Sequence, residues 1–193
     1  MNETRIKHLD ALIAEVGGAL RYQSIQYHLF GDDQKVSVLE NTCPEIWHAI
    51  QDGLFDATVA AVGRLCDKDG NPGKGNITVY AVAKELDSSG NLQKRVYESL
   101  KPTTKLRKNL IRFRHKTVAH ADAATRLGHS VEGSGFRLSE IDDVIKSMMA
   151  AVDILIDYAG ESEYPWQHFG EVRIDPFFET LIEGQKIVGE IPA

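Results

Sequence analysis

Residues 139–160 read SEIDDVIKSMMAAVDILIDYAG, and their apolar side chains recur every three or four positions. The members of this stripe are Ile141, Val144, Ile145, Met148, Val152 and Leu155. This spacing places side chains on one face of an α-helix, so the segment predicts a helix that buries one face in a core. Ser139 is expected to cap the helix, with Asp142 three residues on, and Gly160 is expected to end it.

The same spacing recurs along most of the chain, whereas signals of β-strands are nearly absent. We predict longer helices at residues 3–30, 44–67, 92–100, 102–125 and 139–160, and a short helix at 78–86. Thr42 and Glu45 have the spacing of a capping box, which would start the helix at 44–67. The pattern therefore predicts an all-α fold, a bundle of about five helices.

The last 33 residues lack this periodicity but hold five of the chain's 15 aromatic side chains. These are Tyr164, Trp166, Phe169, Phe177 and Phe178. We therefore divide the chain into a helical bundle at 1–160 and an irregular, aromatic-rich tail at 161–193. The tail is expected to pack on the bundle or on a second subunit.

Composition narrows the class of protein. The 193 residues are 42% hydrophobic and 26% charged, which suits one globular domain with a sizeable core. No apolar run approaches the roughly 20 residues of a membrane span, and Met1–Arg5 does not resemble a signal peptide, so a cytoplasmic location without membrane contact is expected. Two cysteines exclude a disulfide scaffold. Seven histidines show no metal-binding spacing, so we expect no metal and no cofactor.

Charge is unevenly distributed along the chain. Residues 94–116 hold nine lysines and arginines and one acid, Glu98, whereas the remaining residues are strongly acidic. Such a strip is either a solvated helix face or a phosphate-binding surface. In the second reading, the substrate-binding side chains would be Lys105, Lys108, Arg112, Lys116 and Thr117.

Arg114 lies near the end of this strip, and His120 lies four residues beyond it. On an ideal helix they lie about 9 Å apart along the axis and about 120° apart around it, so they flank a shared shoulder without touching. A guanidinium can hold a phosphate through two parallel hydrogen bonds, and an imidazole can titrate near neutral pH. The alternative is structural: His120 fills the edge of the core and Arg114 makes a surface ion pair.

The string Arg114-His115-Lys116-Thr117-Val118-Ala119-His120 resembles the Arg-x(4–6)-His signature of the HEPN superfamily, in its abortive-infection, AbiU-like branch. His115 stands where an acidic or amide residue is typical of that branch. Arg64-Leu65-Cys66-Asp67 resembles its Arg-Leu-x-Asp element, which adds Arg64 and Asp67 to the candidate substrate-binding residues. The resemblance covers about residues 1–160.

The resemblance implies a metal-independent endoribonuclease that works as a homodimer in a phage-defence or toxin system. His120 would transfer protons, Arg114 would stabilise charge on the phosphorane, and His115 would orient or polarise. The partners would be RNA, such as tRNA or mRNA, and a cognate antitoxin. Some HEPN proteins have lost the chemistry, so the alternatives are a non-catalytic module that binds a nucleotide, RNA or a protein, and a purely structural bundle.

Overall fold

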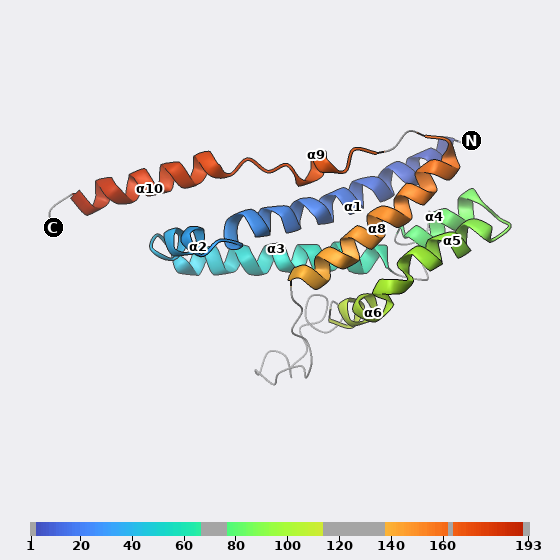
Figure 1. Cartoon of the computed structure of the whole chain (residues 1–193), viewed down its shortest axis with the longest axis horizontal. Helices are drawn as coiled ribbons and strands as arrows, with labels where there is room; N and C mark the ends of the chain where they lie inside the picture. Colours follow the sequence, from blue (N-terminus) through green and yellow to red (C-terminus); the bar gives the residue numbers. More distant parts are fainter. Residues whose placement is uncertain (1–2, 67–76, 114–137, 162–163, 191–193) are drawn as a thin grey trace.

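The computed structural model describes residues 3–66, 77–113, 138–161 and 164–190, and every regular element in these ranges is a helix (Figure 1). The prediction of an all-α fold is confirmed. In chain order, the elements are α1 (Glu3–Phe30), α2 (Asp33–Glu40), α3 (Pro44–Leu65), α4 (Val79–Leu86), α5 (Asn91–Leu100), the 3-10 turn η1 (Lys101–Thr103), α6 (Thr104–Phe113), α8 (Leu138–Ala159), α9 (Gln167–Gly170) and α10 (Asp175–Glu190). The described ranges thus hold more helices than the five or so expected, because α2, α9 and α10 were not foreseen.

Three long helices form the frame of the molecule. α1 packs along α3 and also contacts α8, and the three lie side by side (Figure 1). All six members of the predicted stripe on α8 are at most 1% exposed, so this helix buries the expected face. We call the apolar cluster built by α1, α3, α4, α5, α6 and α8 the main core.

Gly160 ends α8 as predicted. Its backbone is left-handed, with φ of 77°, which glycine adopts without steric cost. The Gly160 amide donates to the carbonyl of Asp157 at 3.1 Å, and the Glu161 amide donates to that of Ile156 at 3.2 Å. These two bonds form a Schellman motif, which satisfies carbonyls that the helix end leaves unpaired.

The short helix α4 closes one end of the main core together with α5. Thr78 caps α4, since its hydroxyl accepts a hydrogen bond from the Ala81 amide at 3.2 Å. Asp87 then organises the turn into α5 by accepting from the amides of Ser89, at 2.8 Å, and Leu92, at 2.9 Å. Hydrogen bonds to Ser89 and Leu92 lower the pKa of the Asp87 carboxyl.

The predicted capping box at the start of α3 is wrong. Cys43 occupies the cap position, and its side chain accepts no capping hydrogen bond from the backbone of α3. The Thr42 hydroxyl instead donates to the carbonyl of Leu39 at 2.7 Å and accepts from the indole of Trp47 at 2.9 Å. The physical reason is α2, which ends at Glu40: the Thr42 hydroxyl bonds the Leu39 carbonyl of that helix and is not available to cap α3. The predicted cap of α8 also differs, because α8 begins at Leu138 and Ser139 lies inside its first turn.

The segment after α8 lies against α1. Trp166 is 7% exposed and joins the main core, and its indole donates to Asp153 of α8 at 2.7 Å. The ring of Phe169 packs so closely on Gly17 that a Cβ atom there would overlap it. Ser24 of α1 donates its hydroxyl to the Gly170 carbonyl at 2.6 Å. Gly17, in the middle of α1, therefore provides the room for this aromatic contact.

Residues 175–190 form a helix, α10, where the sequence pattern predicted an irregular tail. α10 packs on α2, and its C-terminal half extends beyond α2 at one end of the molecule (Figure 1). We call the small apolar cluster that joins them the end cluster; its buried members are Leu29, Leu39, Ile174 and Phe178.

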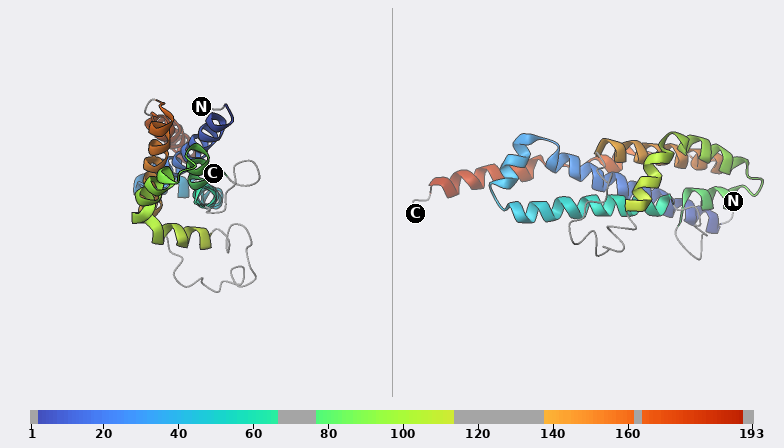
Figure 2. Two further views of the ribbon diagram at one scale, coloured as in Figure 1. Left: turned by 90° about the vertical axis from the view of Figure 1, so that its right-hand side faces the viewer. Right: turned by 90° about the horizontal axis from the view of Figure 1, so that it is seen from below.

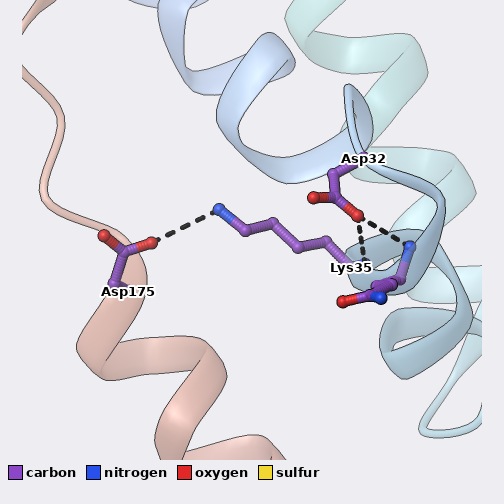
Figure 3. Close-up of polar contacts among 4 residues, drawn as sticks. Asp32, Lys35 and Asp175 are labelled. Atoms are coloured by element: carbon purple, nitrogen blue, oxygen red, sulfur yellow. Dashed lines mark hydrogen bonds and ion pairs between the residues drawn. The ribbon is translucent and has the colours of Figure 1, made fainter.

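Lys35 of α2 holds the start of α10 by two contacts. Its ammonium lies 3.3 Å from a carboxylate oxygen of Asp175, and 5.1 Å from the centre of the Phe178 ring. Figure 3 shows Lys35 extended from α2 towards Asp175, while Asp32 caps α2 by accepting from the amides of Gln34 and Lys35. None of the helices in the described ranges is long and apolar enough to cross a membrane.

Candidate functional site

The described part of the basic strip, residues 94–113, lies in α5, η1 and α6, and the helix periodicity decides which of its side chains are buried. Leu92, Val96 and Leu100 face the main core from α5, and Leu110 does so from α6. The cations that remain exposed in the described part of the strip are Lys94, Arg95, Lys101, Lys105, Lys108 and Arg112. We call these six residues the basic face.

The corner between α5 and α6 is fixed by hydrogen bonds. The Thr103 hydroxyl contacts the Leu100 carbonyl at 3.2 Å and the Ser147 hydroxyl of α8 at 2.8 Å. Figure 2 shows α6 turned across the long axis of α3 after this corner. The exposed cations therefore follow a bent path instead of one straight helix.

The basic face is only partly neutralised. Arg95 lies 3.6 Å from Asp157 of α8, and Lys101 lies 3.4 Å from Glu98, both between exposed side chains. Within the described ranges, no ion pair involves Lys105, Lys108 or Arg112. Exposed ion pairs contribute about 0–1 kcal/mol, so a polyanion can displace them at little cost.

Arg107 differs from the other cations of the strip because it points into the protein. It is 6% exposed. Its guanidinium donates to the Tyr80 hydroxyl of α4 at 3.0 Å, to the Leu100 carbonyl at 2.8 Å and to the Thr104 hydroxyl at 3.3 Å. Its Nε atom is buried without a hydrogen-bond partner. Arg107 thus ties α6 to α4 and to the end of α5, and it is no part of the exposed surface.

The sequence contained a signal for this inward arginine. Arg107 lies four residues after Thr103 and three before Leu110, and both of these neighbours are buried. A residue at this spacing shares their helix face. The net charge of the strip does not reveal that Arg107 is buried, because it is independent of the helix face on which each side chain lies.

Arg64, predicted to bind substrate, lies on α3 in an ion pair with Glu15 of α1. Its Nε atom donates to Glu15 at 2.6 Å, and one terminal nitrogen contacts the same oxygen. The pair links α3 to α1 while the Arg64 side chain keeps 44% of its surface exposed. The role of Arg64 in binding RNA stays a prediction.

The remaining candidate residues lie outside the described ranges. They are Asp67, Arg114, His115, Lys116, Thr117 and His120. The structure describes the chain up to Phe113, directly before Arg114. Phe113 packs edge-on against Phe55 of α3, with ring centres 5.8 Å apart and planes at 82°. The residue directly before the Arg114–His120 motif therefore packs on α3.

Within the described residues, no group of three or more His, Cys, Asp or Glu side chains is placed to hold a metal ion. A partly buried histidine lies beside a carboxylate among the described residues: the Nδ1 atom of His8 is 2.7 Å from an oxygen of Glu85. This contact joins α1 to α4.

Comparison with known families identifies the class of protein. The AbiU2 family profile, HEPN_AbiU2, matches residues 4–176, which include nearly all of α1, the described helices from α2 to α9 and the basic face. The chain therefore belongs to the AbiU2 family of HEPN domains. A search of curated proteins and a search of solved structures each found no match. The resemblance stated from the sequence is confirmed, whereas the roles of Arg114 and His120 stay predictions.

Proposed function

We propose that this protein is a metal-independent endoribonuclease of the HEPN type that acts in phage defence or as a toxin. The observation that carries the proposal is the combination of an AbiU2 family match with an Arg-x5-His string at Arg114–His120. The basic face supports it, because exposed cations on an otherwise acidic chain attract a polyanion, and Lys105, Lys108 and Arg112 form no ion pair within the described ranges.

The proposed reaction needs two proton transfers. A base removes the proton of a ribose 2′-hydroxyl, whose oxygen attacks the adjacent phosphorus. The bond to the 5′-oxygen then breaks, and an acid protonates that leaving oxygen. In our proposal His120 performs proton transfer, Arg114 stabilises the charge that develops on the phosphorane, and His115 orients the reacting groups. The 2′-hydroxyl requirement makes RNA the substrate and excludes DNA.

We expect the active species to be a homodimer. One chain supplies a single His120 to the site, whereas the reaction needs a proton-transfer group on each side of the phosphate. A two-fold axis would bring a second Arg114–His120 pair to the same cleft, because a symmetric contact repeats every residue pair.

The experiment is cleavage of total RNA in the presence of EDTA. The wild type is expected to cleave, and His120→Ala is expected to be slower by about 10²–10⁴-fold, as is typical of losing a general acid or base. His48→Ala is the matched control, since His48 is exposed on α3, outside the motif. Loss of wild-type activity on adding EDTA, or normal cleavage by His120→Ala, would refute the mechanism.

Arginine at position 114 should not be replaceable by lysine. A planar guanidinium contacts two phosphate oxygens at once, whereas an ammonium acts as a point charge. Arg114→Lys is therefore expected to lose most activity in the same assay, while Arg173→Lys, an exposed arginine after α9, should keep it. Mixing His120→Ala with Arg114→Ala should restore partial activity if the site takes groups from both chains.

The alternative is a non-catalytic HEPN module that binds RNA, a nucleotide or a protein. It predicts that the wild type binds RNA without shortening it, and that His120→Ala leaves binding unchanged. Gel analysis of the RNA after incubation, beside a binding titration on the same samples, separates the two functions.

A further inference from the structure

Tyr97 is the one large aromatic side chain that α5 exposes among its cations. It is 45% exposed. Lys94 lies three residues before it and Lys101 four residues after it, so both flank Tyr97 on the outer side of α5. Within the described ranges, no hydrogen bond, ion pair or ring contact of Tyr97 is seen. Neither packing in the main core nor a hydrogen bond of α5 therefore explains why an aromatic side chain stands at position 97.

The spacing fits a nucleic-acid strand. Lys94 and Lys101 are about 10 Å apart along the helix axis, with the Tyr97 ring between them. Cations at this separation can contact phosphates on either side of one nucleotide, while an exposed ring offers a flat surface to its base. The Lys101 ammonium lies 3.4 Å from a carboxylate oxygen of Glu98. Both side chains are exposed, so a phosphate can displace the Glu98 carboxylate from Lys101.

On this basis we infer that Tyr97 is a stacking platform for an unpaired base of single-stranded RNA, with Lys94 and Lys101 holding the adjacent phosphates. The inference rests on the proposed function, because it names how the same basic face holds its RNA. The Tyr97 ring would select single-stranded RNA, since a base within a duplex is already stacked and paired and cannot lie on the ring.

The molecule contains a matched control. Tyr22 of α1 is 39% exposed, close to the exposure of Tyr97. The residues three and four positions from it are Gly18, Ala19, Ile25 and Gln26, none of which is charged. Tyr22 therefore offers an exposed ring without cations three or four positions away, and the guanidinium of the adjacent Arg21 lies over the ring of Phe169.

The test is a binding titration by fluorescence anisotropy, in EDTA and on a His120→Ala background so that the RNA stays intact. The probes are a labelled single-stranded RNA, the same strand with abasic sites, and an RNA duplex. Tyr97→Ala is expected to weaken binding of the intact strand about 5- to 150-fold, the range for losing one base–aromatic stack. Tyr97→Phe and Tyr22→Ala should bind as the parent does.

Two further readouts exclude a merely structural effect. The parent should lose affinity on the abasic strand and on the duplex, whereas Tyr97→Ala should no longer distinguish these from the intact strand. The dependence of affinity on salt should have the same slope in Tyr97→Ala and the parent, because tyrosine carries no charge. Lys94→Gln and Lys101→Gln should each flatten it by about 0.7.

The outcomes separate the inference from the proposal beneath it. If the parent binds none of the probes, both the proposed function and the stacking role fail. If the parent binds and Tyr97→Ala binds equally well, only the stacking role is overturned. An equal loss of affinity for all three probes would also overturn it, since that pattern reports damage to the surface as a whole.

Discussion

Leu12 and Leu29 lie on the same helix, α1, yet they belong to two separate apolar clusters. Leu12 is in the main core, where six helices and Trp166 contribute buried side chains. Leu29 is in the end cluster, which has four buried members and joins α1 and α2 to the start of α10. A large cluster shares its contacts among many elements, whereas a small one depends on each member.

The difference in size between the two clusters predicts which part of the molecule unfolds locally. Regions with few buried apolar contacts unfold locally at a lower free-energy cost than the core. We therefore expect α10 and its contacts with α2 to open while α1, α3 and α8 stay folded. The predictions below test this division, in decreasing order of their effect on global unfolding.

The largest effect is expected from Leu155→Ala in the main core. Leu155 is fully buried, so truncation leaves a cavity and should lower the free energy of unfolding by about 2–5 kcal/mol. Ile182→Ala on α10 is the control, since Ile182 is 40% exposed and should change it by less than about 0.5 kcal/mol. Urea unfolding followed by circular dichroism measures both; similar losses would contradict the division.

Gly17→Ala should destabilise by about 1–3 kcal/mol, because the added methyl group overlaps the ring of Phe169 and forces it to move. The neighbouring change, Gly18→Ala, is the control. A Cβ atom at position 18 meets nothing within 4 Å, so the helix gains up to about 1 kcal/mol from alanine's higher propensity. Thermal unfolding should shift in opposite directions for the two variants, and a shared direction would rule out the Phe169 contact.

Phe178→Ala should leave global unfolding nearly unchanged and act locally. Phe178 is 5% exposed and is one of four buried members of the end cluster, so its loss should release α10 from α2. Hydrogen exchange is the measurement: amides of α10 should exchange faster, while those of α1, α3 and α8 keep their protection. Faster exchange throughout the chain would mean that the two clusters unfold as one unit.

Lys35→Met should have the smallest effect and should depend on salt. It removes the contact with Asp175 and the charge above the Phe178 ring. Because the Lys35 side chain is partly exposed to solvent, its contact with the ring contributes about 0.5–1 kcal/mol. Exchange of the α10 amides should rise slightly at low salt, and the difference from wild type should shrink at high salt. Lys7→Met, which breaks an exposed pair on α1, should leave α10 unaffected.

The sequence predicted the elements whose apolar spacing is regular. The helix at 3–30 matches α1 at both ends, and the stripe and the glycine end of α8 were also foreseen. Thr42 was misjudged because a cap depends on which neighbouring groups compete for its hydroxyl, and α2 was not foreseen. α10 has a helix-start signal in Asp175-Pro176, but the preceding aromatic residues obscured its periodicity.

The candidate site was foreseen unevenly. The exposure of Lys105, Lys108 and Arg112 follows from their helix positions, so the sequence spacing predicts that these three cations face solvent. Arg107 could not be recognised as a buried tie by charge alone, because its partners, Tyr80 and the Leu100 carbonyl, come from other elements. The Arg114–His120 motif lies outside the described ranges and stays a prediction.

The bond between Ser24 and Gly170 spans 146 positions of the chain. A ribosome adds about 5–20 residues per second, so roughly 7–30 s pass between the synthesis of these two residues. During that time α1 has emerged while Phe169, whose ring packs on Gly17 of α1, does not yet exist. The side of α1 that carries Gly17, Arg21 and Ser24 therefore stays uncovered on the nascent chain until residues 164–170 arrive.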